Sequence, residues 1–299
     1  MKSFLILIKR EFWEHKNTFY PYVIVGLLVL VMLAIFMGGE KATVTVNTGD
    51  TANERSVGFL KLLELSAVSF GNMSVAESQD KLRFAYIVIA ANFAFMLSFV
   101  MFFYLLDCLY RDRKDRSILF WKSLPVSDWL TVGIKLFTGL VCVPVVYFLF
   151  IVVTQFIFLL GASLAALSYD VSVWSSLWQP STVVFGVWAD IWFYYTVLLL
   201  WQLPLYSWVI FVSAFARSVP FVWVIGVPFA VVTTESIFGG NATSSWIWHH
   251  VVPQIGKMNL TGVGDIVDRI ASLDFLITLV VSGILVSGAV WFRSKADEM

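Results

Sequence analysis

The chain has 299 residues, of which 59% are hydrophobic, 17% are aromatic and only 13% carry a charge. Its mean hydropathy of +0.84 excludes an ordinary soluble domain and predicts an all-α polytopic membrane protein. The formal net charge is zero, so the overall charge gives no reason to expect a nucleic acid as a partner.

The first predicted elements are an amphipathic helix and a membrane span. Within 1–19, apolar residues recur at helical spacing and charged residues occupy much of the rest, which predicts a helix lying in the headgroup plane. Residues 20–37 supply the ~20 apolar residues that one span requires. Residues 38–83 then predict a long outer loop that carries one surface-lying helix.

A second span, 84–106, leads into the part of the chain that is densest in positive charge. Residues 107–128 form a loop rich in Arg and Lys, and Lys135 follows near the start of the next span, from which it can extend to the inner interface. Because Lys and Arg in short loops mark the cytoplasmic side of a membrane, we place this loop in the cytoplasm.

This cytoplasmic loop predicts a short helix of its own. The helix ends before Pro125, whose ring disfavours helical geometry at the preceding residue. Ser127 or Asp128 can then cap the helix that follows. The short helix carries more apolar surface than a free loop needs, which favours packing against the membrane, other spans or a partner. Its apolar residues are Ile118, Leu119, Phe120 and Trp121.

Four further spans complete the prediction. The third span, 129–161, contains Pro144, which should kink it unless neighbouring helices supply a donor for the freed carbonyl. Two Trp residues, Trp174 and Trp178, mark the next outer segment. The remaining spans are 185–212, 220–238 and 275–292, with an outer re-entrant or interfacial segment at 239–274.

The distribution of charge orients this six-span layout. Most of the 20 basic residues fall on the side of the 107–128 loop, and the others lie in the two long outer loops, where the charge rule is weak. Both termini are therefore predicted to be cytoplasmic.

The sequence contains no catalytic, metal-binding or cofactor-binding motif that we recognise. The pair Gly256-Lys257 lacks the other residues of a phosphate-binding loop, and no HExxH zinc helix or GxSxG elbow is present. His249 and His250 point in different directions on a helix, so they make a poor metal pair. We therefore expect no catalytic residue, no metal and no cofactor in this chain.

Asp190 and Glu235 are the acidic residues inside predicted spans. Ionisable residues at that depth are functional candidates by default. Both lie near an end of their span, however, so a hydrated or hydrogen-bonded structural carboxylate is the favoured interpretation.

Several features together resemble the ABC-2 type permease family, the membrane subunits of ABC transporters with the type V exporter fold. These features are the amphipathic start IKREFWEHKN, the long first outer loop, and the charged loop that closes on a short helix and Leu-Pro-Val-Ser at 124–127. In that family the short helix is the coupling helix that docks on a cytoplasmic ATPase subunit, and a re-entrant outer segment precedes the last span.

The resemblance implies a function and a set of site residues. It implies an exporter subunit of the cytoplasmic (inner) membrane, with two copies, expected as a homodimer, forming the pathway and separate ATPase chains driving it. The side chains assigned to docking are Arg113, Arg116, Ile118, Leu119, Phe120, Trp121, Lys122 and Pro125.

Two alternative functions belong to other classes of membrane protein. An ion-gradient-driven secondary transporter is disfavoured because no charge is predicted at the midplane and no inverted repeat is evident. A non-transporting scaffold or sensor subunit is the second alternative. A neighbouring reading frame that encodes a Walker-type ATPase would separate these alternatives.

Overall fold

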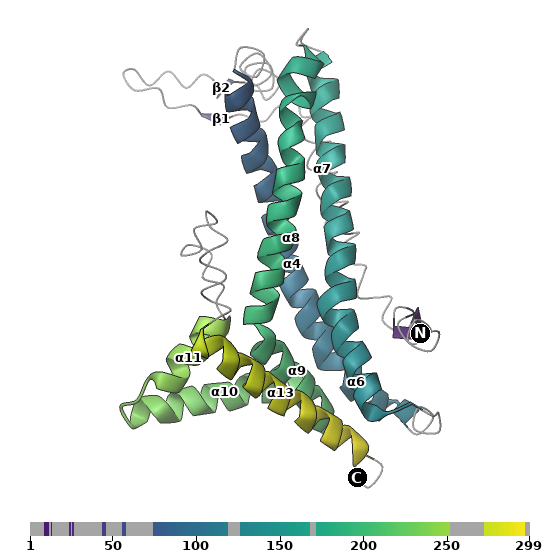
Figure 1. Ribbon diagram of the computed structural model, residues 1–299, viewed down its shortest axis with the longest axis vertical. Helices are drawn as coiled ribbons and strands as arrows, with labels where there is room; N and C mark the ends of the chain where they lie inside the picture. Colours follow the sequence, from purple (N-terminus) through teal and green to yellow (C-terminus); the bar gives the residue numbers. More distant parts are fainter. Residues whose placement is uncertain are drawn as a thin grey trace. The chain divides into compact units, whose positions relative to one another are not determined.

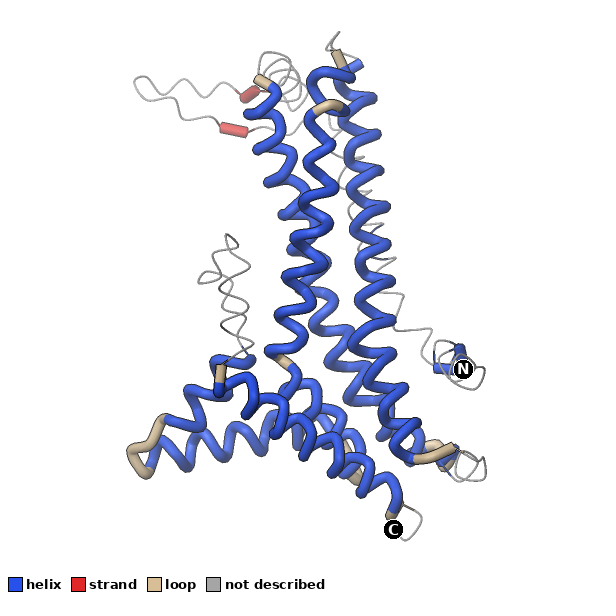
Figure 2. Tube along the Cα trace, in the orientation of Figure 1, coloured by secondary structure: helices blue, strands red, loops and turns tan. Residues whose placement is uncertain are grey.

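The computed structural model describes residues 74–118, 126–167, 172–251 and 272–296, together with residues 9–11, 13, 24 and 26 and two short strands. These strands, β1 (Val44–Thr45) and β2 (Ser56–Val57), pair antiparallel. The rest of the described chain is largely helical (Figure 2).

The helices are labelled in Figure 1. In chain order, the α-helices are α4 (Val75–Lys114), α6 (Asp128–Phe137), α7 (Val143–Leu167), α8 (Val184–Trp201), α9 (Leu203–Phe215), α10 (Pro220–Ile237), α11 (Ala242–Val251) and α13 (Leu273–Ser294). A π-helical turn, η2 (Thr138–Cys142), joins α6 to α7. A second π-helical turn, η3 (Trp174–Trp178), and a 3-10 turn, η4 (Pro180–Val183), precede α8.

Five helical segments of the described chain are long and apolar enough to cross a membrane, so the chain has the character of a multi-pass membrane protein. They are Val75–Lys114, Asp128–Leu164, Pro180–Trp201, Pro220–Ile237 and Leu273–Ser294. The predicted spans 84–106, 129–161 and 275–292 fall inside three of these segments. The predicted first span, 20–37, lies outside the described residues apart from Ile24 and Gly26.

The segment predicted as one span, 185–212, is instead two helices. Helix α8 ends at Trp201, Gln202 is non-helical with φ −85° and ψ 6°, and α9 begins with Pro204 in its first turn. Proline has no N–H and its ring clashes with the preceding turn, so a helix accepts it most readily at its start. The proline therefore separates two helices at a place where hydropathy alone predicts continuity.

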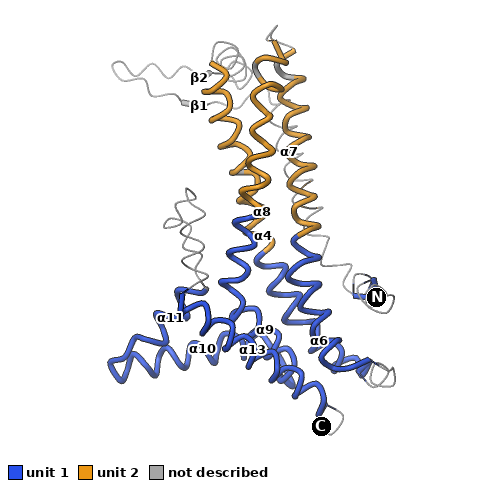
Figure 3. Tube along the Cα trace, in the orientation of Figure 1, with its two compact units in different colours: residues 1–18, 98–144, 193–299 blue, residues 19–97, 145–192 orange. Residues whose placement is uncertain are grey.

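The chain divides into two compact units, which Figure 3 colours separately. One unit comprises residues 19–97 and 145–192. Its core is apolar, yet it buries the amide of Gln155, whose Nε2 donates to the Tyr86 carbonyl at 3.2 Å and whose Oε1 accepts from Trp188 Nε1. Polar side chains of this kind join helices in an apolar environment. One buried cluster of this core consists of Leu82, Tyr86, Leu159, Leu177 and Val187.

The other unit comprises residues 1–18, 98–144 and 193–299. Helices α9 and α13 pack closely there, since a Cβ added to Gly288 would lie 2.7 Å from Cε2 of Phe211. The ring of Phe211 also contacts Phe215 and Phe292, at centroid distances of 6.1 and 5.7 Å. A side chain larger than hydrogen at residue 288 would thus collide with an aromatic cluster.

Two internal prolines of this unit each free a helix carbonyl, and an aromatic side chain is in position to bind each one. Pro144 cannot donate to the carbonyl of Leu140, which accepts from the Tyr195 hydroxyl at 3.4 Å. Pro228 cannot donate to the carbonyl of Val224, which accepts from the Trp208 indole N–H at 3.1 Å. Neighbouring helices therefore supply donors for carbonyls that the prolines leave unpaired.

We expect Trp208→Phe to lower the free energy of unfolding by about 1–2 kcal/mol, because the Val224 carbonyl loses its donor in an apolar environment. The control is the same change in a Pro228→Ala background, where the alanine supplies a backbone N–H and the change should cost less. Thermal unfolding of the four proteins in detergent measures this coupling. Equal losses in both backgrounds would contradict the explanation.

Candidate functional site

Six charged side chains of alternating sign form a continuous array, which we call the charge chain. Its members, in order of contact, are Arg10, Glu11, Lys135, Asp112, Arg293 and Asp128. Arg10 Nη2 lies 2.7 Å from Glu11 Oε1, which lies 3.1 Å from Lys135 Nζ. Lys135 Nζ is 3.5 Å from Asp112 Oδ1, and Asp112 Oδ2 is 3.1 Å from Arg293 Nη1. Arg293 Nε ends the array, 3.1 Å from Asp128 Oδ1.

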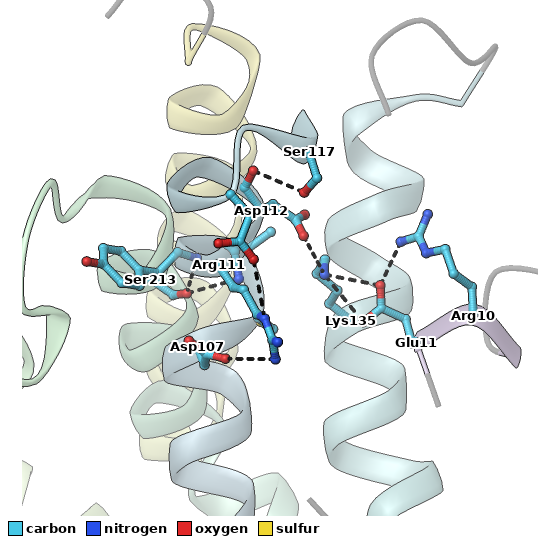
Figure 4. Close-up of polar contacts among 12 residues, drawn as sticks. Arg10, Glu11, Asp107, Arg111, Asp112, Ser117, Lys135 and Ser213 are labelled. Atoms are coloured by element: carbon cyan, nitrogen blue, oxygen red, sulfur yellow. Dashed lines mark hydrogen bonds and ion pairs between the residues drawn. The ribbon is translucent and has the colours of Figure 1, made fainter. Parts of the chain in front are cut away.

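The charge chain joins four helical elements. Asp112 lies in the last turn of α4 and Arg293 in the last turn of α13, while Asp128 and Lys135 both belong to α6. Glu11 comes from the N-terminal segment and also accepts a hydrogen bond from the Tyr104 hydroxyl at 3.4 Å. Figure 4 shows Lys135 between Glu11 and Asp112. Residues far apart in sequence are thus fastened together at the end of α4.

The middle of the charge chain is withdrawn from solvent. The side chains of Glu11 and Lys135 are 0% exposed and that of Arg293 is 3% exposed. The prediction that Lys135 extends to the membrane interface is therefore wrong, because two carboxylates bind its ammonium inside the protein. Three positive and three negative groups balance, and removing one partner from such a set would strand a buried charge.

Arg113, one of the predicted docking residues, binds the end of another helix. Its Nη2 donates to the carbonyls of Ser213 and Ala216, at 2.6 and 2.8 Å. These groups lie at the C-terminus of α9, where the helix dipole favours a cation. The Ser213 hydroxyl in turn lies 3.1 and 3.0 Å from the backbone N–H groups of Leu109 and Tyr110. Each helix therefore binds the backbone of the other through a side chain: Arg113 of α4 binds α9, and Ser213 of α9 binds α4.

The other predicted docking residues have different environments. Arg116 is exposed and has a φ of 54°, in the left-handed region, where the chain leaves α4. Ile118 is buried. The expectation that Ser127 or Asp128 caps the next helix is confirmed for Ser127, whose hydroxyl accepts from the N–H of Leu130 at 3.2 Å. The remaining docking residues lie outside the described residues; they are Leu119, Phe120, Trp121, Lys122 and Pro125.

The two carboxylates inside predicted spans have the kind of structural partners that we expected. Asp190 forms an exposed ion pair with Arg83, at 3.0 Å. Glu235 accepts from the backbone N–H groups of Thr243 and Ser244, at 2.6 and 2.7 Å, and so caps the start of α11.

The charge chain was not predicted from the sequence as a set. One usable signal was Lys135 itself, because a lone cation just inside an apolar segment requires a buried carboxylate when it cannot reach water. The partners Glu11 and Asp112 lie in charged stretches, where a solvated role is the usual expectation. Among the described residues, no group of three or more His, Cys, Asp or Glu side chains could hold a metal ion.

Every member of the charge chain has a partner of opposite charge, so the array can hold the elements that carry it together. Comparison with known proteins adds no identification, because no family model, no curated protein and no solved structure matches the chain.

Proposed function

We propose that this chain is the membrane permease subunit of an ATP-binding cassette exporter, driven by ATP hydrolysis in a separate cytoplasmic subunit. One observation carries the proposal. The charge chain includes the residues that flank the segment between α4 and α6, with Asp112 before it and Asp128 and Lys135 after it. A protein docked on that segment would act on both helices at once.

The energetics of the charge chain support transmission of such a movement. Separating a buried ion pair leaves uncompensated charge in an apolar environment, which is strongly unfavourable. Glu11 and Arg293 should therefore move together with α4 and α6 rather than lose their contacts. A force applied to the connecting segment would reach the N-terminal helix and α13 through these pairs.

The proposal includes an orientation and an assembly. The basic residues around α4 and α6, together with the N-terminal and C-terminal basic residues, face the cytoplasm in a multi-pass cell-membrane protein. Two copies form the pathway, and one ATPase subunit docks on each. This chain itself carries no catalytic residue for ATP hydrolysis.

Within the docking segment, the proposed roles follow residue type. Leu119, Phe120 and Trp121 include the apolar anchors, whereas Ile118 is buried within the chain; Arg116 and Lys122 orient the partner by charge. Pro125 fixes the angle at which the segment meets α6. Arg113 contributes indirectly, because its guanidinium binds the C-terminus of α9.

The test is the double change Phe120→Ala, Trp121→Ala. If both side chains are interface anchors, each loss costs about 2 kcal/mol, or roughly 30-fold in affinity, so the proposed ATPase subunit should no longer co-purify with the chain. The matched control is Trp174→Ala, which removes an indole that is 70% exposed and lies far along the chain from this segment.

The variants should insert into the membrane normally, which protease protection of the outer loop measures. Unchanged co-purification and unchanged ATPase stimulation in the double variant would refute the coupling assignment. ATP hydrolysis by a preparation free of any ATPase subunit would refute the division of labour between the two chains.

A further inference from the structure

His250 is a buried titratable side chain that takes no part in the charge chain. It lies in the last turn of α11 and is 3% exposed. Its ring stacks on that of Trp201, with 4.9 Å between centroids and 5° between planes. The ring of Trp246 lies 4.3 Å away from it, centroid to centroid. The imidazole thus packs against two indoles.

Both ring nitrogens of His250 have hydrogen-bond partners. Nδ1 lies 2.8 Å from the carbonyl of Trp246, which can only accept, so Nδ1 carries a hydrogen. Nε2 lies 2.9 Å from the Thr278 hydroxyl, which also lies 2.8 Å from the carbonyl of Asp274. When the imidazole is neutral, the Thr278 hydroxyl has a single hydrogen, which can go either to Nε2 or to the Asp274 carbonyl. When Nε2 is protonated, it donates to the hydroxyl oxygen and the hydroxyl donates to the carbonyl, so both contacts are hydrogen bonds.

We propose that His250 is a proton-binding site, at which one proton taken from water is held on Nε2 and donated to the Thr278 hydroxyl, whose own hydrogen turns to the Asp274 carbonyl. No covalent bond other than N–H forms. The imidazolium would pack against two indoles at the C-terminus of α11, and both surroundings favour a cation.

The charged and titratable groups around the site are few. His249 on the same helix opposes a positive charge at His250, and Asp274 on α13 favours it. Helix α10 contributes Glu235, which binds the opposite end of α11. Residues 193–201 of α8 and all of α9 contain no Asp, Glu, Lys, Arg or His. Two neighbours, His249 and Asp274, therefore act on the charge of His250 in opposite directions.

Burial is the largest influence and lowers the pKa of His250 below its ordinary value, while the hydrogen bond to Trp246 opposes that shift. The folded protein therefore binds this proton less tightly than the unfolded chain does. The stability that neutral His250 contributes is complete above the ordinary pKa near 6.5 and is lost as the pH falls through the folded value. Acidification through this range should accordingly lower the free energy of unfolding, because the cost of burying the charged imidazole exceeds the gain from its contacts.

The experiment follows the imidazole signals by NMR in the full chain, labelled at histidine and held in lipid nanodiscs. The chain has only 3 His, so His250→Gln assigns the signal and His249→Gln is the matched control. We expect a His250 midpoint below 6.5 and, at high pH, the tautomer with hydrogen on Nδ1. The His249→Gln variant should retain both features.

Substitutions at residue 278 test the Nε2 contact. Thr278→Val should lower the midpoint by about 0.5–1 pH unit, because a charged donor loses its acceptor, whereas Thr278→Ser should keep the midpoint close to that of the parent. A neutral tautomer with hydrogen on Nε2, a His250 signal that does not titrate above about pH 4, or equal midpoints for the Val and Ser variants would overturn the proposal.

Discussion

Replacing Lys135 with Met is expected to lower the free energy of unfolding by about 3–5 kcal/mol, the usual effect of removing one member of a buried ion pair. The Lys135 ammonium binds both Glu11 and Asp112 and is fully buried, so its loss leaves Glu11 without its cation from α6. Thermal unfolding of the purified protein in detergent measures the loss. This is the largest effect that we expect from a single substitution.

Two controls make this result specific to charge. Lys114→Met removes an exposed ammonium from the end of α4 and should change stability by less than about 1 kcal/mol. The double change Lys135→Met, Glu11→Gln should recover part of the loss, because the stranded carboxylate is neutralised while Asp112 keeps Arg293. Equal losses at Lys135 and Lys114, or no recovery in the double variant, would show that the charge chain does not hold these elements together.

The second large effect is expected at Gly288, where Val should cost about 3 kcal/mol through overpacking. Its Cβ would lie 2.7 Å from the ring of Phe211. That ring cannot move freely, since it packs against Phe215 and Phe292. Forcing it aside would separate α9 from α13.

The same helix provides the matched control. Gly283 has no atom within 4 Å of its added Cβ, so Gly283→Val places the same side chain on α13 without the collision. Only the Gly288 variant should show a lowered midpoint of thermal unfolding. Phe211→Leu in the Gly288→Val background should restore part of the stability, and a failure of that rescue would argue against a direct steric cause.

If the charge chain transmits movement as proposed, its variants should lose a different property from variants that only destabilise the fold. A residue that only stabilises the fold should reduce the amount of folded protein, whereas a coupling residue should reduce transport per folded, ATPase-bound molecule. Lys135→Arg keeps the charge but changes its geometry. It therefore serves to separate these two roles.

Membrane character and most helix positions could be predicted from the sequence alone. The reason is physical: a segment surrounded by lipid must pair its own backbone polar groups, so a long apolar run can only be a helix there. The predicted spans 84–106 and 275–292 accordingly fall within α4 and α13, and the Ser127 cap followed from local chemistry. Hydropathy did not separate α8 from α9, because a proline after Gln202 changes the backbone without changing how apolar the segment is.

Only the tertiary structure determined which charges meet. Lys135 and Glu11 are 124 residues apart, and Arg293 and Asp112 are 181 residues apart. No local pattern links such residues, and each separately has an ordinary role as an interfacial anchor or a solvated charge. Their pairing depends on the last turns of α4 and α13 meeting α6 and Glu11 at one place. Burial there leaves each of these charges no partner but another charge.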